Sequence, residues 1–316
     1  MQIVSYRGPF QPGGVASLIQ PALKEDAEST WWHLHDHYLQ CAALDSARLK
    51  RKAHISEGIV EGHYRYCNEF LWPLMHGRDD LCHYSEADRD NYKALNMAVA
   101  ACLNLSVDRH GAFVHDYQLG LVSEYLAQRQ SSISSFFWHI PWPATLPIGA
   151  ESHVAEIANG LLRFRKIGFH LQAYAENFRA FVQQHLPEYT VSCDGSIISR
   201  SGRQIDVIAN PAGVDSGFWY GAARAGERIS PLNVPYILSV DRADYTKGIV
   251  ERIEAIRILF RDNPALKGKL QFVFVCQQTR SGLAAFDQYW ERCQSLYREC
   301  INEFGSDEWT PIVWLP

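Results

Sequence analysis

The chain has 316 residues, of which 47% are hydrophobic and 21% charged, and its formal net charge is −5. This length and balance indicate a globular protein of roughly two domains. The sequence has no basic run or stripe of the kind that binds nucleic acid, and no apolar stretch near the roughly 18 to 20 residues of a membrane helix. We therefore expect neither a nucleic-acid partner nor a membrane partner.

The eight cysteines are scattered along the chain without a CxxC pair, and several lie in apolar or helical stretches. The first residues, MQIVSYRG, have neither the cationic region nor the long apolar region of a secretory signal. The sequence therefore predicts reduced, largely structural thiols and a cytoplasmic protein.

The predicted elements alternate between strands and helices from the first residues onward. In chain order they are a strand at 2–6, a glycine loop at 7–14, a helix at 15–25, a strand at 27–37, a helical stretch at 56–76 and a helix at 86–105. Pro73 is expected to break the helical stretch. Ser85 is a predicted N-cap of the last helix, because its hydroxyl can accept a backbone N–H and acidic residues follow it.

The middle of the chain continues the same alternation. It has predicted strands at 111–119, 132–143 and 166–171, predicted helices at 121–129 and 172–186, and a predicted hairpin at 196–215. Apolar strands that alternate with helices are typical of α/β proteins with parallel sheets, and this is the fold class that we predict.

A stretch rich in Gly, Pro and Ser at 216–235 marks a change of composition, and we place a domain boundary near residue 230. The first domain would comprise residues 1–230 and the second residues 231–316. The second is smaller than the roughly 100 to 150 residues that are commonest for a domain. We therefore expect the chain to stop partway through its second domain.

The second domain begins with a strand, a loop, a helix and another strand. VPYILSV (234–240) is a predicted buried strand, and IVERIEAIRILF (249–260) is a predicted amphipathic helix that precedes the strand LQFVFVC (270–276). In such a parallel unit, ligands bind at the loop that leaves the carboxyl end of the strand. Arg242 and Lys247 in this loop would suit a phosphate or pyrophosphate at the helix N-terminus. The alternative is that they are solvated loop charges.

Two features near strand ends of the first domain each admit two interpretations. Gly13 and Gly14, together with Arg7, either let a phosphate approach a helix start or form a plain tight turn. Asp116, which follows His115 at the end of a strand, either binds sugar hydroxyls or caps the next helix.

Two further residues lie in aromatic surroundings. His139 is either a catalyst or a core residue whose ring nitrogens have hydrogen-bond partners. Trp72 either forms the floor of a sugar site or fills the core. The three histidines of HLHDH, which are His33, His35 and His37, would project to one face of a strand. Their spacing resembles metal ligation, and they support the alternative of a metal-dependent hydrolase.

Seven segments resemble, in their order along the chain, the conserved blocks of the trehalose-6-phosphate synthase family and of its relative glucosylglycerol-phosphate synthase. They are SYRGPFQPGG, NEFLWPLMHG, VHDYQL, FFWHIPWP, IGFHL, NPAGVD and LSVDRADYTKG. The resemblance runs through essentially all of the chain. It implies the GT-B architecture, in which two Rossmann-like domains face each other across a cleft. The first would hold a phosphorylated acceptor and the second a nucleotide-activated glucose.

The resemblance also implies a role for each matching residue. Donor binding would involve Gly13, Gly14, His139, Arg242 and Lys247. Acceptor binding would involve Arg7, His63, Tyr64, Trp72, Asp116 and Arg280. The implied catalytic residues are Asp116, His139, Arg242 and Lys247. The implied reaction is glucosyl transfer with retention of configuration by front-face attack, in which the cations neutralise the leaving diphosphate. It would need no metal and no cofactor, because the nucleotide-glucose is a substrate.

The sequence departs from the family pattern in its acceptor half. The first strand reads SYR where the trehalose-6-phosphate synthases usually have SNR, and His63, beside Tyr64, stands in place of their acceptor tyrosine. GFHLQAYAENF also looks more like the glucosylglycerol-phosphate branch. We therefore expect glycerol 3-phosphate as the acceptor, with glucose 6-phosphate as the alternative and with ADP-glucose and UDP-glucose both open as donors.

An acidic block that grips the donor's sugar and ribose is expected after residue 316. Its absence from this chain supports an alternative of another class, a catalytically silent acceptor-binding fragment. The sequence does not decide between a monomer and a homo-oligomer.

Overall fold

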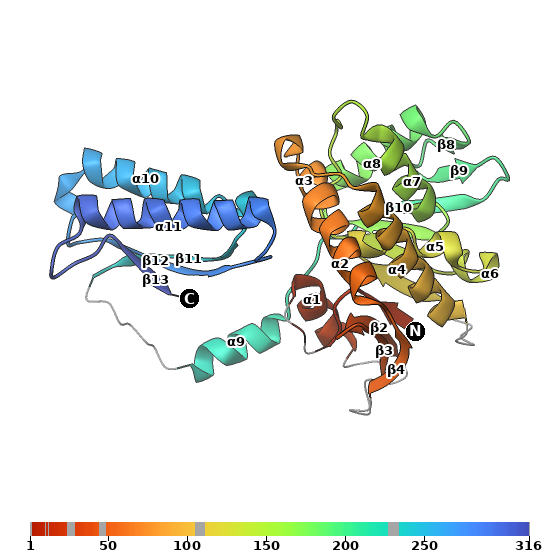
Figure 1. Ribbon diagram of the computed structural model, residues 1–316, viewed down its shortest axis with the longest axis horizontal. Helices are drawn as coiled ribbons and strands as arrows, with labels where there is room; N and C mark the ends of the chain where they lie inside the picture. Colours follow the sequence, from red (N-terminus) through yellow and green to blue (C-terminus); the bar gives the residue numbers. More distant parts are fainter. Residues whose placement is uncertain are drawn as a thin grey trace. The chain divides into compact units, whose positions relative to one another are not determined.

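The structure is a computed structural model, and it describes residues 2–9, 11, 13–23, 29–43, 49–104, 111–226 and 234–315. The chain forms two compact units, Met1–Phe218 and Trp219–Pro316 (Figure 1). The boundary predicted near residue 230 stays a prediction, because residue 230 lies outside the described residues. The predicted end of the first helix at 24–25 and the predicted start of the next strand at 27–28 also lie outside them.

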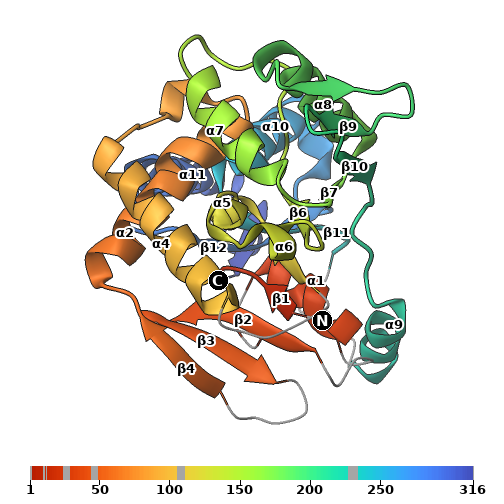
Figure 2. The same ribbon diagram turned by 90° about the vertical axis from the view of Figure 1, so that its right-hand side faces the viewer.

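The first unit is built on one mixed sheet, in which the described residues form ten strands in the order β4-β3-β2-β1-β5-β6-β7-β10-β9-β8. The strands are β1 Gln2–Val4, β2 Thr30–His35, β3 Tyr38–Ala43, β4 Leu49–His54, β5 Ala112–His115, β6 Ser135–Trp138, β7 Lys166–Phe169, β8 Tyr189–Val191, β9 Ile197–Ser199 and β10 Gln204–Ala209. The strands from β2 to β10 in this order pair in parallel. Antiparallel strands flank them on both sides, and Figure 2 shows β3 and β4 continuing the sheet beyond β2. The predicted parallel α/β fold is confirmed.

Helices connect these strands. They are α1 Gly14–Leu23, α2 Glu57–Arg65, the π-helix η1 Tyr66–Leu71, α3 Trp72–Met75, α4 Glu86–Asn104, α5 Val122–Tyr125, α6 Gln128–Ser131, α7 Glu151–Leu161 and α8 Gln172–His185, with short 3₁₀ turns η2 Asp79–Leu81 and η3 Tyr117–Leu119. Ser85 caps α4 as predicted, because its hydroxyl accepts the Asp88 N–H at 3.3 Å. The helix predicted at 121–129 is instead two single turns, α5 and α6.

The predicted break at Pro73 is wrong, because the helical path continues through this proline. The π-helix precedes it, and the Trp72 N–H donates to the Cys67 carbonyl five residues back. A proline at 73 cannot bond the carbonyl of Glu69 four residues before it. The backbone N–H of His83 bonds that carbonyl instead, at 2.7 Å. The helix therefore loses no buried partner at Pro73, and Trp72 is held at the start of the next turn.

The parallel strands bring their carboxyl ends to one edge of the sheet. From β1 the chain passes to β2 on one side, whereas β5 pairs with β1 on the other side. Such a reversal of strand order is where α/β sheets bind ligands. The segments that follow β1, β5, β6 and β7 contain Arg7, Asp116, His139 and His170 respectively.

The second unit has a three-stranded parallel sheet within its described residues, formed by β11 Tyr236–Ala243, β12 Gln271–Gln278 and β13 Ile312–Leu315. Its helices are α10 Ile249–Asp262 and α11 Ala284–Phe304, with 3₁₀ turns η4 Tyr245–Lys247 and η5 Pro264–Leu266. Figure 1 shows α10 and α11 on the same face of the sheet. Helix α9 (Ser216–Ala225) spans the division between the units.

The apolar face of α10 confirms the predicted amphipathic helix, since Ile249, Ile253, Ile256 and Phe260 are all buried in the core of the second unit. The prediction that β11 is buried is wrong. This strand is an edge of the sheet in the described residues, and its Leu238 and Val240 side chains are 56% and 63% exposed.

Two observations concern the expectations about a membrane partner and about the cysteines. In the described part of the chain, no helix is both long and apolar enough to span a membrane. All eight cysteines lie in that part, and none of them is joined in a disulfide there.

Candidate active site

Asp116 joins the ends of β5 and β6 in the first unit. Its Oδ1 accepts the Tyr117 N–H at 2.9 Å and the His139 N–H at 3.3 Å, and its own N–H donates to the Phe137 carbonyl at 2.8 Å. Its φ of +77° is rare for a residue other than glycine, although aspartate tolerates it better than most. The structure therefore brings Asp116 and His139 together, and the carboxylate has the predicted capping role.

His139 is the middle member of a row of three imidazoles. Its Nε2 lies 3.0 Å from His115 Nδ1, and its Nδ1 lies 3.1 Å from His170 Nε2. Burial, together with these two neighbouring rings, lowers the pKa of His139 to about 2. Burial lowers the pKa of His115 to about 3. At neutral pH the row is therefore uncharged, and both ring nitrogens of His139 already have partners.

The loop after β1 places Arg7 near the start of α1. Its side chain is exposed, and a Cβ added to Gly13 would lie 3.3 Å from Arg7 Cδ. A Cβ at Gly14 would meet no described atom within 4 Å. The glycines therefore leave open space at the first turn of α1, as a close backbone approach would require.

His63 and Trp72 lie deeper than their implied acceptor roles suggest. His63 is fully buried and stacks between the rings of Tyr6 and Tyr92, with centroid distances of 5.1 and 5.3 Å. Its Nε2 lies 2.9 Å from the Gln118 carbonyl, and burial lowers its pKa to about 4. Tyr64, the next residue, is partly exposed.

Trp72 is 8% exposed, and its ring lies 5.9 Å from that of Tyr117, the residue after Asp116. The Tyr117 hydroxyl is 3.3 Å from Asn68 Oδ1 in the π-helix. These contacts link the π-helix to the loop of Asp116. Such helical irregularities are frequent at functional sites.

In the second unit, Arg242 and Lys247 lie where β11 ends and α10 begins. Both side chains are exposed. Among the described residues, neither side chain has a hydrogen-bonding or ion-pair partner. Two uncompensated cations on one short loop suit a ligand that carries more than one negative charge.

Other side chains hold this loop in place. Asp244, which is fully buried, accepts the Thr246 N–H and hydroxyl through Oδ1 and binds Arg280 Nη1 through Oδ2 at 2.5 Å. Arg252 donates to Asp241 Oδ2 at 2.7 Å and also to the Lys247 carbonyl. The loop is therefore fixed from both its strand side and its helix side.

Arg280 has less freedom than its implied acceptor role suggests. Its guanidinium is paired with Asp244, lies 4.8 Å from the centroid of the Phe286 ring, and leaves the side chain 11% exposed. It follows β12, so the strand pairing brings it beside the loop of Lys247. Asp244, Arg252 and His170 were not singled out in the sequence, although Asp244 two residues before Thr246 is a recognisable Asx-turn pattern.

The start of α10 offers fewer donors than predicted. The N–H groups of Ile249 and Val250 both lie within hydrogen-bond distance of the Tyr289 hydroxyl, at 2.8 and 3.2 Å. The cationic side chains, rather than these two amides, are therefore the groups that remain available to an anion.

The three histidines of HLHDH do not share a strand face. His33 is buried in β2 against Gly8, and β2 ends at His35, which pairs with Asp36. His37 follows in a turn with a φ of +62°. The shared strand face on which the alternative of a metal-dependent hydrolase rested therefore does not form. Within the described residues, no three side chains of the metal-binding types are arranged to hold an ion.

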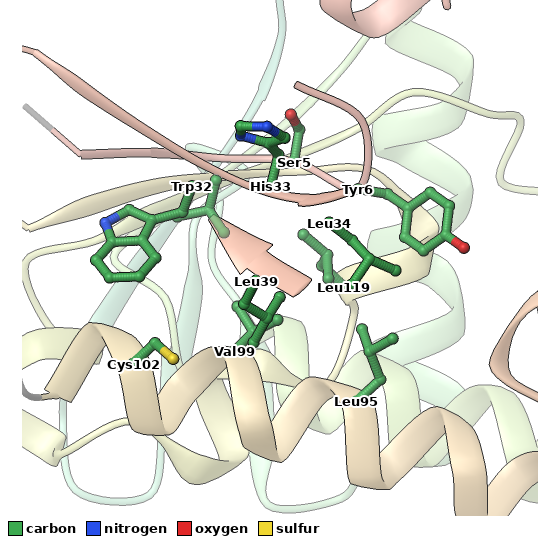
Figure 3. A pocket seen from close by; sticks show the side chains of 11 residues that line it. Ser5, Tyr6, Trp32, His33, Leu34, Leu39, Leu95, Val99, Cys102 and Leu119 are labelled. Carbon is green, nitrogen blue, oxygen red and sulfur yellow. The ribbon is translucent and has the colours of Figure 1, made fainter. Parts of the chain in front are cut away.

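A small cavity lies beside β1 and β2. Figure 3 shows Leu34, Leu39, Leu95 and Val99 around it, on the β2–β3 hairpin and α4. None of the implied site residues lines the cavity, although Tyr6 does. Its largely apolar lining indicates a packing defect of the core rather than a sugar site.

Comparison with known proteins assigns the family. The model of glycosyltransferase family 20 matches residues 13–316. The chain belongs to glycosyltransferase family 20. This membership confirms the family-level resemblance that the seven sequence segments indicated.

Two relatives of this chain are each less than 30% identical to it. The alpha,alpha-trehalose-phosphate synthase [UDP-forming] of Candida albicans is 29% identical, and the match covers 98% of this chain and 69% of that protein. The bifunctional trehalose-6-phosphate synthase/phosphatase of Thermoproteus tenax is 28% identical over 83% of this chain, but the match spans only 37% of that protein's length.

The solved structures share the fold. A crystal structure of the Burkholderia xenovorans alpha,alpha-trehalose-phosphate synthase (UDP-forming), in complex with glucose-6-phosphate, is 26% identical. It superposes with a TM-score of 0.85 over 99% of this chain and 74% of that one. This family 20 chain thus has the GT-B fold of these synthases, whereas the roles of individual residues stay predictions.

Proposed function

We propose that the protein is a glucosyltransferase that moves glucose from UDP-glucose to glucose 6-phosphate and so makes trehalose 6-phosphate. The observation that carries the proposal is the pair of exposed cations, Arg242 and Lys247, on a loop that Asp244 and Arg252 hold in place. Membership of family 20 supports the reaction class.

The chemistry follows from charge. When the bond between the glucose anomeric carbon and the diphosphate oxygen breaks, that oxygen keeps the electron pair and negative charge develops on the leaving nucleotide. Two cations on a loop that is already held in place stabilise this charge as it develops. The acceptor hydroxyl forms the new bond to the anomeric carbon, and its proton passes to the oxygen of the leaving diphosphate. The proposal keeps the expectation that no metal or cofactor is needed.

Glucose 6-phosphate replaces glycerol 3-phosphate as the preferred acceptor. The similar proteins are named as trehalose-phosphate synthases, and one of them was crystallised with glucose-6-phosphate. Glycerol 3-phosphate is the second candidate, because the two departures from the family pattern, Tyr6 and His63, stack directly on each other. A paired change of this kind favours an altered acceptor pocket.

The test offers the purified protein UDP-glucose or ADP-glucose with each acceptor, and identifies the product by mass spectrometry. Trehalose 6-phosphate as the main product supports the proposal, and glucosylglycerol phosphate alone would overturn it. Calorimetry with each acceptor distinguishes an active enzyme from a catalytically silent fragment, because the fragment would bind the acceptor without turnover. The double variant Tyr6→Asn/His63→Tyr restores the family pattern, and we expect it to raise the preference for glucose 6-phosphate.

A further inference from the structure

The row of three histidines has a fixed direction. A backbone N–H can only donate, and the Ala212 N–H lies 3.2 Å from His170 Nδ1. His170 Nδ1 therefore carries no proton, and in a neutral ring the proton must be on Nε2. That N–H donates to His139 Nδ1, so His139 in turn carries its proton on Nε2 and donates to His115 Nδ1. A single amide thus sets three tautomers.

At the other end of the row, His115 has one ring nitrogen without a partner among the described residues. His115 is 4% exposed, and its Nε2 has no hydrogen-bond partner in the part of the chain that the structure describes. In the assigned direction this atom is a buried donor without an acceptor, which is an unfavourable state. The reverse direction would leave the same atom unpaired and would also set His170 Nδ1–H against the Ala212 N–H. The observed direction is therefore the better of the two.

We propose that His170 is a positioning residue that holds His139 neutral, with its proton on Nε2, and that the Ala212 amide anchors this arrangement. The inference rests on the proposed function for its catalytic consequence, because His139 is one of the residues implied in glucosyl transfer. Its structural content stands on the hydrogen-bond geometry alone.

One consequence follows for a bound sugar. Both ring nitrogens of His139 are occupied, Nδ1 by His170 and Nε2 by His115. As long as this row is intact, a sugar hydroxyl cannot bond either nitrogen, and His139 meets the sugar as an oriented neutral ring.

The anchoring amide, that of Ala212, belongs to the segment that leads from the first unit toward the second. Ala212 is in the stretch between β10 and α9, a few residues before the division at Phe218. A movement of this stretch that withdraws the Ala212 N–H would free the row to reverse. The tautomer of His139 is thereby coupled to the conformation of the connecting segment.

The spectroscopic test needs no substrate. Long-range ¹H–¹⁵N spectra of the histidine-labelled protein distinguish protonated from bare ring nitrogens, and we expect the proton on Nε2 of His115, His139 and His170. A proton on Nδ1 of His139 would overturn the proposal. Ala212→Pro removes the anchoring N–H and should give mixed tautomers, whereas the control Ala212→Ser keeps that N–H and the wild-type pattern. Wild-type tautomers in Ala212→Pro would also overturn it.

The second test follows the position of the proton on the His139 ring. The titratable groups against it are His115, His170 and Asp116. His170→Phe keeps the ring packing but removes the donor to His139 Nδ1, so the proton of the neutral His139 ring is no longer held on Nε2 and both tautomers can form. We expect a mixture of His139 tautomers in the spectra and a loss of kcat of about 10- to 100-fold.

The matched variant is His170→Gln, whose side-chain N–H₂ can replace Nε2–H and should restore most of kcat and the wild-type tautomer. Equal loss in both variants, without a change of the His139 tautomer in His170→Phe, would contradict the positioning role. If neither acceptor supports transfer in the wild type, the proposed function fails, while the spectra still decide the tautomer assignment. Should His170→Phe fail to fold, the Ala212 pair carries the test.

Discussion

Arg242 and Lys247 lie exposed and unpaired among the described residues, whereas Arg252, Arg257 and Arg280 of the same unit each face a carboxylate. A cation that is already paired contributes little to a new anion, because the ligand must compete with its partner. The two unpaired cations are therefore the residues whose removal should affect the reaction without affecting the fold.

We expect Arg242→Ala and Lys247→Ala each to lose about 3 to 4 kcal/mol of transition-state stabilisation, or roughly 100- to 1000-fold in kcat/KM. Steady-state kinetics with UDP-glucose would measure this loss, and thermal unfolding should stay unchanged. Arg261→Ala, which removes an exposed cation paired with Asp262 at the other end of α10, is the control. Wild-type rates in both variants would remove the basis of the proposed function.

At the scale of elements, the site depends on how loops are attached to their strands. Asp244 connects the loop after β11 to the segment after β12, because one carboxylate caps η4 and binds Arg280. The Asp244 side chain is fully buried and that of Arg280 is 11% exposed. Loss of one partner would therefore leave a buried charge uncompensated.

Asp244→Ala should lower the free energy of unfolding by about 3 to 5 kcal/mol, as is typical when one partner of a buried ion pair is removed. Urea unfolding would measure the loss. The double variant Asp244→Ala/Arg280→Leu leaves no unpaired charge, so it should recover part of the stability. It should not recover activity, because η4 remains uncapped. If the double variant were less stable than Asp244→Ala, the pair would not be the cause.

The sequence predicts most elements because their signals are local. The apolar spacing of α10 and the cap at Ser85 are both visible within a few residues. The missed elements fall into two groups. Helices α7 and α11 have apolar residues at helical spacing and could have been found. Strand β3 and the edge strands β4 and β8 have no strong pattern of their own.

The tertiary contacts at the candidate site could not be predicted. Nothing in the sequence says that the Tyr289 hydroxyl takes two N–H groups of α10, or that His83 satisfies the carbonyl that Pro73 leaves open. Nor does it say that Tyr6 stacks on His63. These contacts join residues that lie far apart in the chain, so only the fold reveals them.

At the scale of the whole molecule, buried neutral histidines make stability depend on pH. The pKa of His63 falls to about 4 and that of His115 to about 3 in the folded protein, mainly because of burial. The unfolded chain takes up these protons near pH 6.5, whereas the folded chain does not. The contribution of each histidine is therefore complete above pH 6.5 and is lost as the pH falls toward the folded value.

When the pH is lowered from 7.5 to 5, the free energy of unfolding should fall by about 2 kcal/mol for each of the two histidines. Denaturant unfolding at several pH values would measure the total change. His115→Phe suits the aromatic neighbours Phe113 and Phe137 and should reduce that change by the share of one histidine. The exposed His83→Gln is the control. An unaltered pH dependence in His115→Phe would contradict the assignment.

Asp116 bears on how substitution experiments in this molecule should be interpreted. Its backbone has a positive φ, and its carboxylate fastens the ends of two neighbouring strands. An alanine there would strain the backbone and release both amides at once, so a lost activity could not be attributed to lost chemistry. Asparagine tolerates the same backbone and keeps an acceptor oxygen. Asp116→Asn therefore separates the charge of this side chain from its structural task.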